Sequence, residues 1–185
     1  MIIVGYGGHG RVTADIARAL GEPPSAFLDD KPAAVTADAV ISGPIRKEIP
    51  RHITTHRYVV AIGATAIRRE LSEMILAAGG ELAILVHPTA IIAPDVTIGG
   101  GTVIMAGAIV NIGTRIGRFA VVNTGAILDH DNVVEDNVHI SPGCSLAGRV
   151  TCSRDSFIGT GASIIPRVIV GEGAIVAAGS TVIKP

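Results

Sequence analysis

The sequence lacks most of the features that mark membrane, secreted and nucleic-acid-binding proteins. It has no tryptophan, three phenylalanines, two tyrosines and two cysteines. Two cysteines are too few for the disulfide framework of a small secreted domain. Fifteen basic and sixteen acidic side chains leave a net charge of -1, so no excess positive charge attracts nucleic acid or an anionic membrane. No apolar run approaches the roughly 20 residues that a membrane-spanning helix needs.

The first residues do not lead us to expect a secretory signal peptide. The apolar start Met1–Val4 is too short for the core of a signal peptide, and no basic segment precedes it. We therefore expect a cytoplasmic protein. Because aromatic residues make up only 3% of the chain and hydrophobic residues 48%, the core must consist of regular layers of aliphatic side chains.

What the sequence does contain changes in character near residue 88. Before that point, short apolar runs alternate with helix-like stretches. Strands are expected at Met1–Val4, Ser25–Leu28, Tyr58–Ile62 and Leu82–Val86, and helices at Val12–Leu20 and Ile67–Ala78. This alternation predicts a small, Rossmann-like parallel α/β sheet. Since Pro88 cannot continue a central strand, we expect an α/β domain at residues 1–88 and a second domain at residues 89–185.

The second part of the chain repeats every six residues. Of the sixteen positions reached by steps of six from Ile92 to Val182, fifteen are aliphatic and the other is Cys152. A six-residue period fits neither an α-helix nor an array of hairpins, but it is a signature of a parallel β-helix. Three repeats make one coil of eighteen residues, and successive coils stack about 4.8 Å apart.

With this repeat, the second part resembles the hexapeptide-repeat acyltransferases, whose coils form left-handed triangular prisms. The resemblance implies a left-handed parallel β-helix and a trimer. The residue before each inward position should point outward, and residues eighteen apart should share a face. One such column is apolar except for a histidine; it comprises Val103, Val121, His139, Phe157 and Ile175. Because exposed apolar stripes usually mark interfaces, we expect this face to contact other copies of the chain in a homotrimer.

The most polar stretch of the repeat is Leu128-Asp129-His130-Asp131-Asn132. Acetyl transfer from a thioester requires a base that removes a proton from the attacking amine or hydroxyl group. An imidazole titrates near neutrality, and an adjacent carboxylate can fix its tautomer and increase its basicity. His130 and Asp131 are therefore candidates for catalysis, with a solvated loop histidine as the alternative. Cys144 and Cys152 fall at inward positions, so we expect both in the core rather than as nucleophiles.

The segments Asn123-Thr124, His130-Asp131 and Val138–Gly143 closely resemble one bacterial subfamily. It comprises the nucleotide-sugar acetyltransferases of bacillosamine and perosamine biosynthesis and their sialic-acid O-acetyltransferase relatives. The resemblance implies N-acetylation of the 4-amino group of a nucleotide-linked sugar by acetyl-CoA. It makes His130 the general base that allows direct attack on the thioester, and Asp131 the residue that tunes it.

The same resemblance implies where acetyl-CoA binds. Its expected contacts are His139, Gly148, Thr160 and Ala178. His130 and His139 are nine residues apart, which is half a coil, so one chain should place them on different sides of the prism. If both serve one acetyl group, each active site lies between two subunits.

A glycine-rich loop, Gly5-Tyr6-Gly7-Gly8-His9-Gly10, follows the first predicted strand. Asp29 and Asp30 come about twenty residues later, where a dinucleotide-binding fold places a ribose-binding acid. An NAD-dependent oxidoreductase is therefore an alternative. However, the α/β part is hardly longer than one mononucleotide-binding half, and no group of residues suited to hydride transfer follows it.

By resemblance, the loop instead binds the nucleotide sugar. The residues implied are Gly7, Gly8 and His9 in the loop, Asp29 and Asp30 facing the base or ribose, and Gly63 and Arg68 in a second ligand loop. Ala64-Thr65 stands where the family commonly has Asn or Asp, which leaves the preference for uracil or guanine open. The sequence does not decide whether the nucleotide is UDP, GDP or CMP.

Three other functions are compatible with the pattern. They are sugar O-acetylation of the sialic-acid type, a non-catalytic trimeric scaffold that binds nucleotides, and a prism carbonic anhydrase. For the last, the histidines are not clustered as a zinc site requires, and we expect no metal. Relatives normally continue beyond Ile183-Lys184-Pro185 into a loop that closes over CoA, so we expect either a truncated chain or CoA held differently.

Overall fold

A parallel sheet flanked by helices forms the N-terminal domain in the computed structural model, which describes residues 1–31, 40–53 and 56–184. The strands are β1 (Ile2–Val4), β2 (Ala26–Leu28), β3 (Val40–Ser42), β4 (Arg57–Val60) and β5 (Glu81–Leu82), and the helices are α1 (Gly8–Ala19), α2 (Ile45–His52) and α3 (Thr65–Ala77). Their order in the sheet is β3-β2-β1-β4-β5, and every pair is parallel. The central strand β1 is wholly apolar and buried, as expected for a strand covered on both faces. The predicted α/β sheet is confirmed.

Two features of this domain differ from the sequence prediction. β3 and α2 are not predicted, and α2 carries a proline, Pro50, inside the helix, which obscures its periodicity. The single closing strand expected at Leu82–Val86 is wrong, because β5 pairs with β4 whereas β6 (Leu85–Val86) pairs with β9 of the second domain. An apolar run does not reveal which of its residues join one sheet and which join the next. The domain limits at residue 88 stay a prediction, although solenoid pairing already begins at Leu85.

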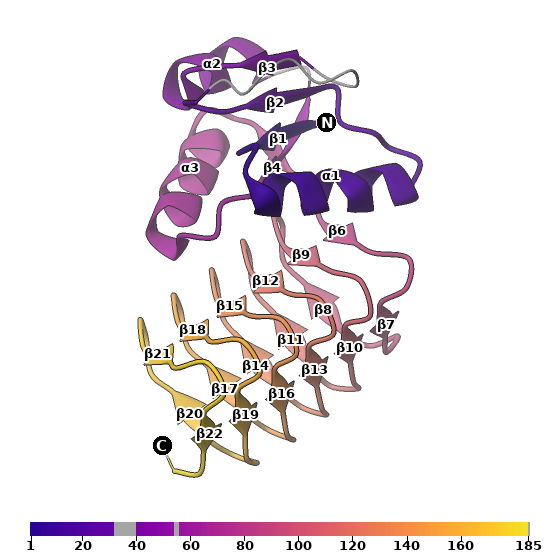
Figure 1. Cartoon of the computed structure of the whole chain (residues 1–185), viewed down its shortest axis with the longest axis vertical. Coiled ribbons are helices and arrows are strands. Elements are labelled where there is room, and N and C mark those ends of the chain that lie inside the picture. The colour runs from indigo at the N-terminus through magenta and orange to yellow at the C-terminus, as the bar shows by residue number, and fades with distance from the viewer. Residues whose placement is uncertain (32–39, 54–55, 185) are drawn as a thin grey trace.

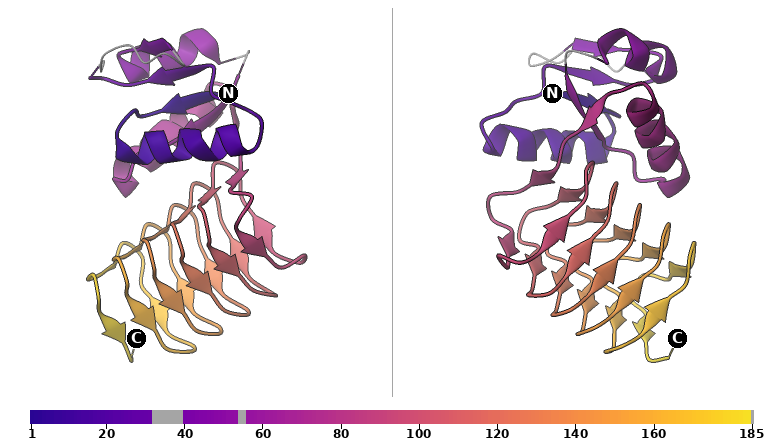
Figure 2. Two further views of the ribbon diagram at one scale, coloured as in Figure 1. Left: turned by 45° about the vertical axis from the view of Figure 1, so that its right-hand side comes forward. Right: turned by 180° about the vertical axis from the view of Figure 1, so that it is seen from behind.

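The rest of the chain winds into a three-sided solenoid below the α/β domain (Figures 1 and 2). Each side is a parallel sheet of two-residue strands, and the sides are numbered here in chain order. Face 1 contains β6, β9 (Val103–Ile104), β12 (Val121–Val122), β15 (His139–Ile140), β18 (Phe157–Ile158) and β21 (Ile175–Val176). Face 2 contains β7 (Ile91–Ile92), β10 (Ile109–Val110), β13 (Ile127–Leu128), β16 (Ser145–Leu146), β19 (Ser163–Ile164) and β22 (Thr181–Val182). Face 3 contains β8 (Thr97–Ile98), β11 (Arg115–Ile116), β14 (Val133–Val134), β17 (Thr151–Cys152) and β20 (Ile169–Val170).

The second residue of each strand points into the solenoid and forms its core. Neighbouring strands pair residues eighteen apart, for example Val110 with Leu128 and Leu128 with Leu146. The six-residue period predicted this arrangement, which is confirmed. Cys144 and Cys152 are fully buried in the core, as predicted. Burial raises the pKa of Cys152 to about 12 and also raises the pKa of Cys144, so neither thiol is activated.

The upper part of face 1 is covered by the chain's own α/β domain. Val103 and Val121 are each 1% exposed and belong to an apolar cluster with Ile16 of α1 and Val59 of β4. The expectation that these two residues form an exposed interface is therefore wrong. Periodicity shows which residues point outward but not which of them a neighbouring domain covers. Ile175, which is 78% exposed, and the half-buried Phe157 remain accessible, and their contact with other copies stays a prediction.

Arg68 of α3 ties the two domains together. Its side chain is 1% exposed, and its guanidinium donates to the carbonyl oxygens of Phe119 and Asn137, both at 2.9 Å. It also donates to the carbonyls of Ile62 and Gly63 at 3.1 and 3.3 Å. Burial lowers the pKa of Arg68 to about 10, which still leaves the group charged at neutral pH. A single buried cation thus joins the loop after β4 to two successive solenoid turns.

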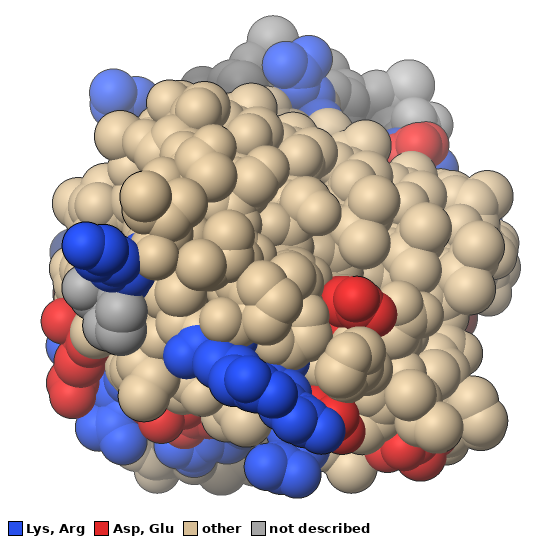
Figure 3. Space-filling model, turned by 90° about the horizontal axis from the view of Figure 1, so that it is seen from below, with Lys and Arg blue, Asp and Glu red and all other residues tan. Residues whose placement is uncertain are grey.

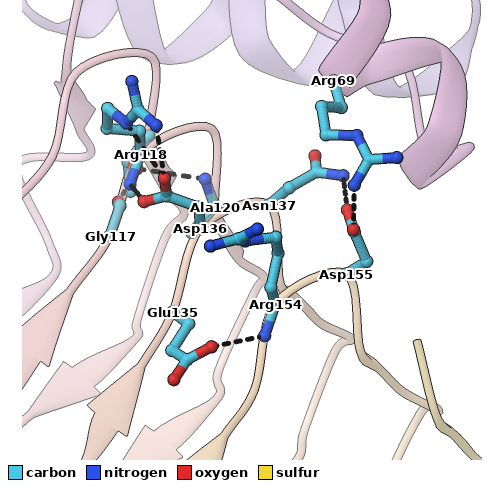
Figure 4. Close-up of polar contacts among 10 residues, drawn as sticks. Arg69, Gly117, Arg118, Ala120, Glu135, Asp136, Asn137, Arg154 and Asp155 are labelled. Carbon is cyan, nitrogen blue, oxygen red and sulfur yellow. Dashed lines mark hydrogen bonds and ion pairs between the residues drawn. The ribbon is translucent and has the colours of Figure 1, made fainter. Parts of the chain in front are cut away.

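Weaker polar contacts surround this tether at the corner between faces 3 and 1, below α3 (Figure 4). Arg69 forms an ion pair with Asp155, and the Asn137 side-chain amide donates to the same carboxylate at 2.6 Å. One turn higher, Arg118 pairs with Asp136 at 2.7 Å. These ion pairs are partly exposed, so each contributes little to stability.

Replacing Arg68 should therefore destabilise the protein far more than replacing its neighbour Arg69. Arg68→Met leaves four carbonyl groups without their charged donor, and we expect a loss on the order of 3 kcal/mol in the free energy of unfolding. Arg69→Ala removes only a partly exposed ion pair, and we expect a loss below about 1 kcal/mol. Urea denaturation followed by circular dichroism measures both. Equal losses in the two variants would contradict the role assigned to Arg68.

Candidate active site

A cleft of about 560 Å³ opens at the carboxyl ends of β1, β2 and β4. This is where parallel α/β sheets bind ligands. Of the residues expected to bind substrate, Gly7, Gly8, His9, Asp29, Asp30 and Gly63 all line the cleft. Arg68 does not line it, since its donors are taken by backbone carbonyls, including those of Ile62 and Gly63. Its position supports a role in holding the second loop rather than contacting a ligand.

The glycine loop leads into an uncapped helix N-terminus that faces the cleft. Helix α1 begins at Gly8, directly after the loop, and no side chain caps its first turn. The loop turns so tightly that a Cβ on Gly10 would lie 2.0 Å from the carbonyl oxygen of Gly5, which excludes any other residue there. Free backbone N–H groups at a helix N-terminus attract anions, and the cleft lies against them.

The two aspartates differ in what they can offer a ligand. The carboxylate of Asp29 accepts hydrogen bonds from the backbone N–H groups of Tyr6 and Lys31, at 2.7 and 2.8 Å. It therefore fastens the glycine loop to the end of β2. Asp30 uses one oxygen to accept the N–H of Ile45 at the start of α2. Its second oxygen accepts no hydrogen bond from the part of the chain that the structure describes, and Asp30 is exposed at the cleft.

Two cationic side chains at the cleft are absent from the sequence prediction. Lys31 follows Asp30, and Arg46 lies on the unpredicted helix α2, where it pairs with Glu70 of α3 at 2.8 Å. Lys31 could have been inferred from its place next to the aspartates. Arg46 could not, because its position depends on α2 packing beside the cleft.

His9 and His139 meet at the junction of the two domains. Their ring centroids are 6.3 Å apart, and His139 stacks on Phe157 at 4.8 Å. Burial, followed by the charge of Arg68, lowers the pKa of His9 to about 4 and that of His139 to about 3, so both are neutral at pH 7. His9 Nε2 and His139 Nδ1 are buried without a hydrogen-bond partner among the described residues. Two neutral, unpaired imidazole nitrogens are therefore buried where the two domains meet.

His130 and Asp131 lie elsewhere, on the corner between faces 2 and 3. The Nδ1 of His130 is 2.9 Å from Asp131 Oδ2, and the two side chains are 47% and 50% exposed. The hydrogen bond with His130, with a smaller contribution from Arg149, holds the pKa of Asp131 below its usual value. An ionised carboxylate at Nδ1 favours the tautomer with the proton on Nδ1, which leaves the Nε2 lone pair available as a base.

Gly148 makes room for this base. A Cβ on Gly148 would lie 2.5 Å from His130 Nε2 and 2.6 Å from Cε1, so the imidazole rests directly on the glycine. His130, Gly148 and Arg149 belong to the lining of a pocket of about 340 Å³. Gly148 was expected to contact acetyl-CoA, and the structure places it at the nitrogen that would take the proton.

The remaining predicted residues lie at a third place. Thr160 and Ala178 are exposed on stacked turns of the corner between faces 1 and 2, where Gly179 N–H donates to the Thr160 carbonyl at 2.8 Å. His139 lies on face 1, opposite the corner that carries His130. The expectation that His130 and His139 lie on different sides of one prism is confirmed. A single chain does not bring the two histidines together.

The described ranges contain no group of three or more His, Cys, Asp and Glu side chains arranged to hold a metal ion. No helix in these ranges is both long and apolar enough to cross a membrane.

Comparisons with known proteins match the N-terminal part in one case and nearly the whole chain in another. The family model of the PglD N-terminal domain matches residues 1–75. A mutant form of perosamine N-acetyltransferase from Caulobacter crescentus, crystallised in complex with CoA and GDP-perosamine, superposes with a TM-score of 0.94. The two are 34% identical, and the match covers 99% of this chain and 88% of that one.

Two curated proteins match over shorter regions. GDP-perosamine N-acetyltransferase of Escherichia coli O157:H7 is 35% identical over 119 residues, which cover 62% of this chain and 54% of the relative. UDP-N-acetylbacillosamine N-acetyltransferase of Bacillus subtilis strain 168 is 40% identical over 108 residues, which cover 56% of this chain and 50% of the relative. The matched region thus spans about half the length of these curated relatives.

The structural match includes both the α/β domain and the left-handed parallel β-helix, with an identity above 30% over nearly the whole chain. The chain therefore belongs to the bacterial nucleotide-sugar N-acetyltransferase family that includes the perosamine and bacillosamine enzymes.

Proposed function

We propose that this chain transfers the acetyl group of acetyl-CoA to the 4-amino group of a nucleotide-linked sugar. The observation that carries the proposal is the His130-Asp131 pair, in which the carboxylate orients the imidazole and leaves Nε2 open above Gly148. The cleft at the glycine loop supplies a separate place for the nucleotide. The names of the relatives support an amino group as the acceptor and CoA as the carrier.

Direct transfer fits these groups without a covalent enzyme intermediate. His130 Nε2 accepts a proton from the amine nitrogen as that nitrogen forms a bond to the acetyl carbonyl carbon. Asp131 stabilises the resulting imidazolium through its hydrogen bond to Nδ1. When the C–S bond breaks, the imidazolium returns the proton to the thiolate of CoA. Both cysteines are buried in the solenoid core with raised pKa values, which makes neither a nucleophile.

The position of His139 supports an active site shared between copies of the chain. His139 lies beside the nucleotide cleft, whereas His130 is on the opposite corner of the same prism. A sugar held in the cleft of one subunit can reach a base only if the His130 corner of another subunit lies against it. The half exposure of His130 in a single chain is consistent with a partner covering it. We propose a homotrimer with three such sites.

The reaction is tested by measuring release of free thiol from acetyl-CoA with a panel of UDP-, GDP- and CMP-linked sugars. We expect turnover with a 4-amino sugar, and we expect His130→Ala to lower kcat at least about 100-fold, as loss of a general base does. His87→Ala is the matched control, because His87 is a solenoid turn histidine whose Nδ1, among the described residues, has hydrogen-bond contacts with Thr89 alone. Turnover with hydroxyl acceptors alone would favour O-acetylation. An unchanged rate in His130→Ala would show that His130 is not the general base.

The shared site is tested by co-expressing two inactive variants, His130→Ala and His139→Ala, with different affinity tags. If one subunit supplies His130 and its neighbour supplies His139, random trimers regain about a quarter of the wild-type sites. If a site uses both histidines of one chain, every site stays defective. Absence of activity in purified mixed trimers would therefore contradict sharing, as would a fully active His139→Ala variant.

Gly148→Ala should impair catalysis without unfolding the protein. The added methyl group overlaps His130 Nε2, a movable side-chain atom, so the imidazole shifts while the backbone is retained. Because small displacements of a catalytic group are costly, we expect kcat to fall about 100-fold with an unchanged urea midpoint. Gly171→Ala is the control, since a Cβ at Gly171 has nothing within 4 Å. Normal turnover by Gly148→Ala would show that the ring position is not critical.

A further inference from the structure

Two arginines follow His130 and Asp131 along the same corner of the solenoid. Asp131, Arg149 and Arg167 are eighteen residues apart and occupy the same turn position in successive coils. Backbone hydrogen bonds fix the stacking: Arg149 N–H donates to the His130 carbonyl at 2.9 Å, and Arg167 N–H donates to the Gly148 carbonyl at 3.1 Å. Both arginines line the pocket that contains His130.

The local backbone does not call for arginine at these positions. Arg149 and Arg167 have φ values of 63° and 65°, in the left-handed region that disfavours bulky residues. Gly113 has the same conformation two coils above Arg149, with a φ of 74°. Two like charges on adjacent rungs of a parallel ladder also repel each other. The turn backbone therefore accepts arginine here but does not require it.

The guanidinium groups are largely free to bind a ligand. Arg149 Nε lies 3.6 Å from Asp131 Oδ2, and the Arg149 side chain is 57% exposed. Arg167 is exposed, and within residues 1–31, 40–53 and 56–184 its guanidinium forms no hydrogen bond or ion pair. The other carboxylate nearby, that of Asp129, accepts hydrogen bonds from the Asn111 side chain and the His130 N–H. Arg167 thus has no counter-ion among the described residues, whereas Arg149 lies beside the carboxylate of Asp131.

The charge along this corner changes sign at the candidate base. Towards the α/β domain the same turn position carries Asp95, whose carboxylate accepts the Gly113 N–H at 2.9 Å. Towards the C-terminal coils it carries Arg149 and Arg167. Seen from below, blue cationic side chains form a row on the underside of the molecule, with red acidic ones beside it (Figure 3). This polarity would orient a molecule with one anionic end so that this end points to the C-terminal coils.

We propose that Arg149 and Arg167 bind a phosphate group of one of the two reactants at the mouth of the His130 pocket. The proposal rests on the proposed function, in which both acetyl-CoA and the nucleotide sugar carry a pyrophosphate. A guanidinium matches phosphate through paired N–H donors, and two of them one coil apart can hold adjacent oxygens. The coil spacing places the arginines about 5 and 10 Å along the axis from the base.

The test compares Arg149→Gln, Arg167→Gln and the double variant in steady-state kinetics. We expect the double variant to raise the KM of one reactant about 10- to 100-fold, as loss of charge-assisted hydrogen bonds does. A rise in the KM of acetyl-CoA assigns the site to CoA, and a rise in the KM of the nucleotide sugar assigns it to the sugar diphosphate. Arg115→Gln is the matched control, because Arg115 is an exposed arginine on face 3 of the same solenoid, away from the pocket.

Binding measured by calorimetry separates this proposal from the proposed function. The probes are CoA, pantetheine, UDP and GDP, and pantetheine serves as a CoA fragment without phosphate. If the wild-type protein acetylates no sugar but its affinity for CoA, UDP or GDP depends on the arginines, the proposed function fails and the site stands. If the wild type is active and both KM values of the double variant stay within twofold, the site is refuted. An equal KM change in Arg115→Gln would refute it too, because a general charge effect would then be sufficient.

Discussion

Pairing of residues eighteen apart is the constraint on which the rest of the molecule depends. Each coil contributes one strand to each face. The neighbours of a side chain along the solenoid are therefore the residues eighteen positions before and after it. The register places Gly148 under the imidazole of His130 and Arg149 beside Asp131. A one-residue slip in a strand would move its aliphatic side chain from the core to the surface. Functional residues in the turns are therefore held by the same pairing that stabilises the core.

The second constraint is the buried guanidinium of Arg68. It joins carbonyl groups of the loop after β4 to carbonyl groups of two solenoid turns, and thereby fixes the cleft relative to face 1. His9 and His139 meet at this junction and remain neutral because they are buried beside the same cation. The orientation of the cleft at the glycine loop towards the prism thus depends on a residue that does not line the cleft.

The sequence predicted what depends on periodicity and on local motifs. The hexapeptide repeat specified the solenoid strands from Ile92 onward but missed β6, and the glycine loop with Asp29 and Asp30 indicated the cleft. It did not predict contacts between elements distant in the chain. Val103 and Val121 point outward as expected, but only the packed α1 shows that they are covered. Arg68 resembles a ligand residue in sequence, and its burial against Phe119 and Asn137 is a tertiary effect that no local pattern encodes.

The separation of the cleft from the base has a physical advantage for a two-substrate reaction. A nucleotide sugar held in the cleft of the α/β domain would lie out of reach of His130, which is on the far corner of the prism of the same chain. Assembly of copies would bring the two halves together and cover a base that is otherwise half exposed. Exclusion of water from the completed site would strengthen the hydrogen bond between His130 and Asp131, because electrostatic interactions increase as the local dielectric falls. In the proposed trimer, oligomerisation would both bring the catalytic groups together and set the environment in which His130 would act as a base.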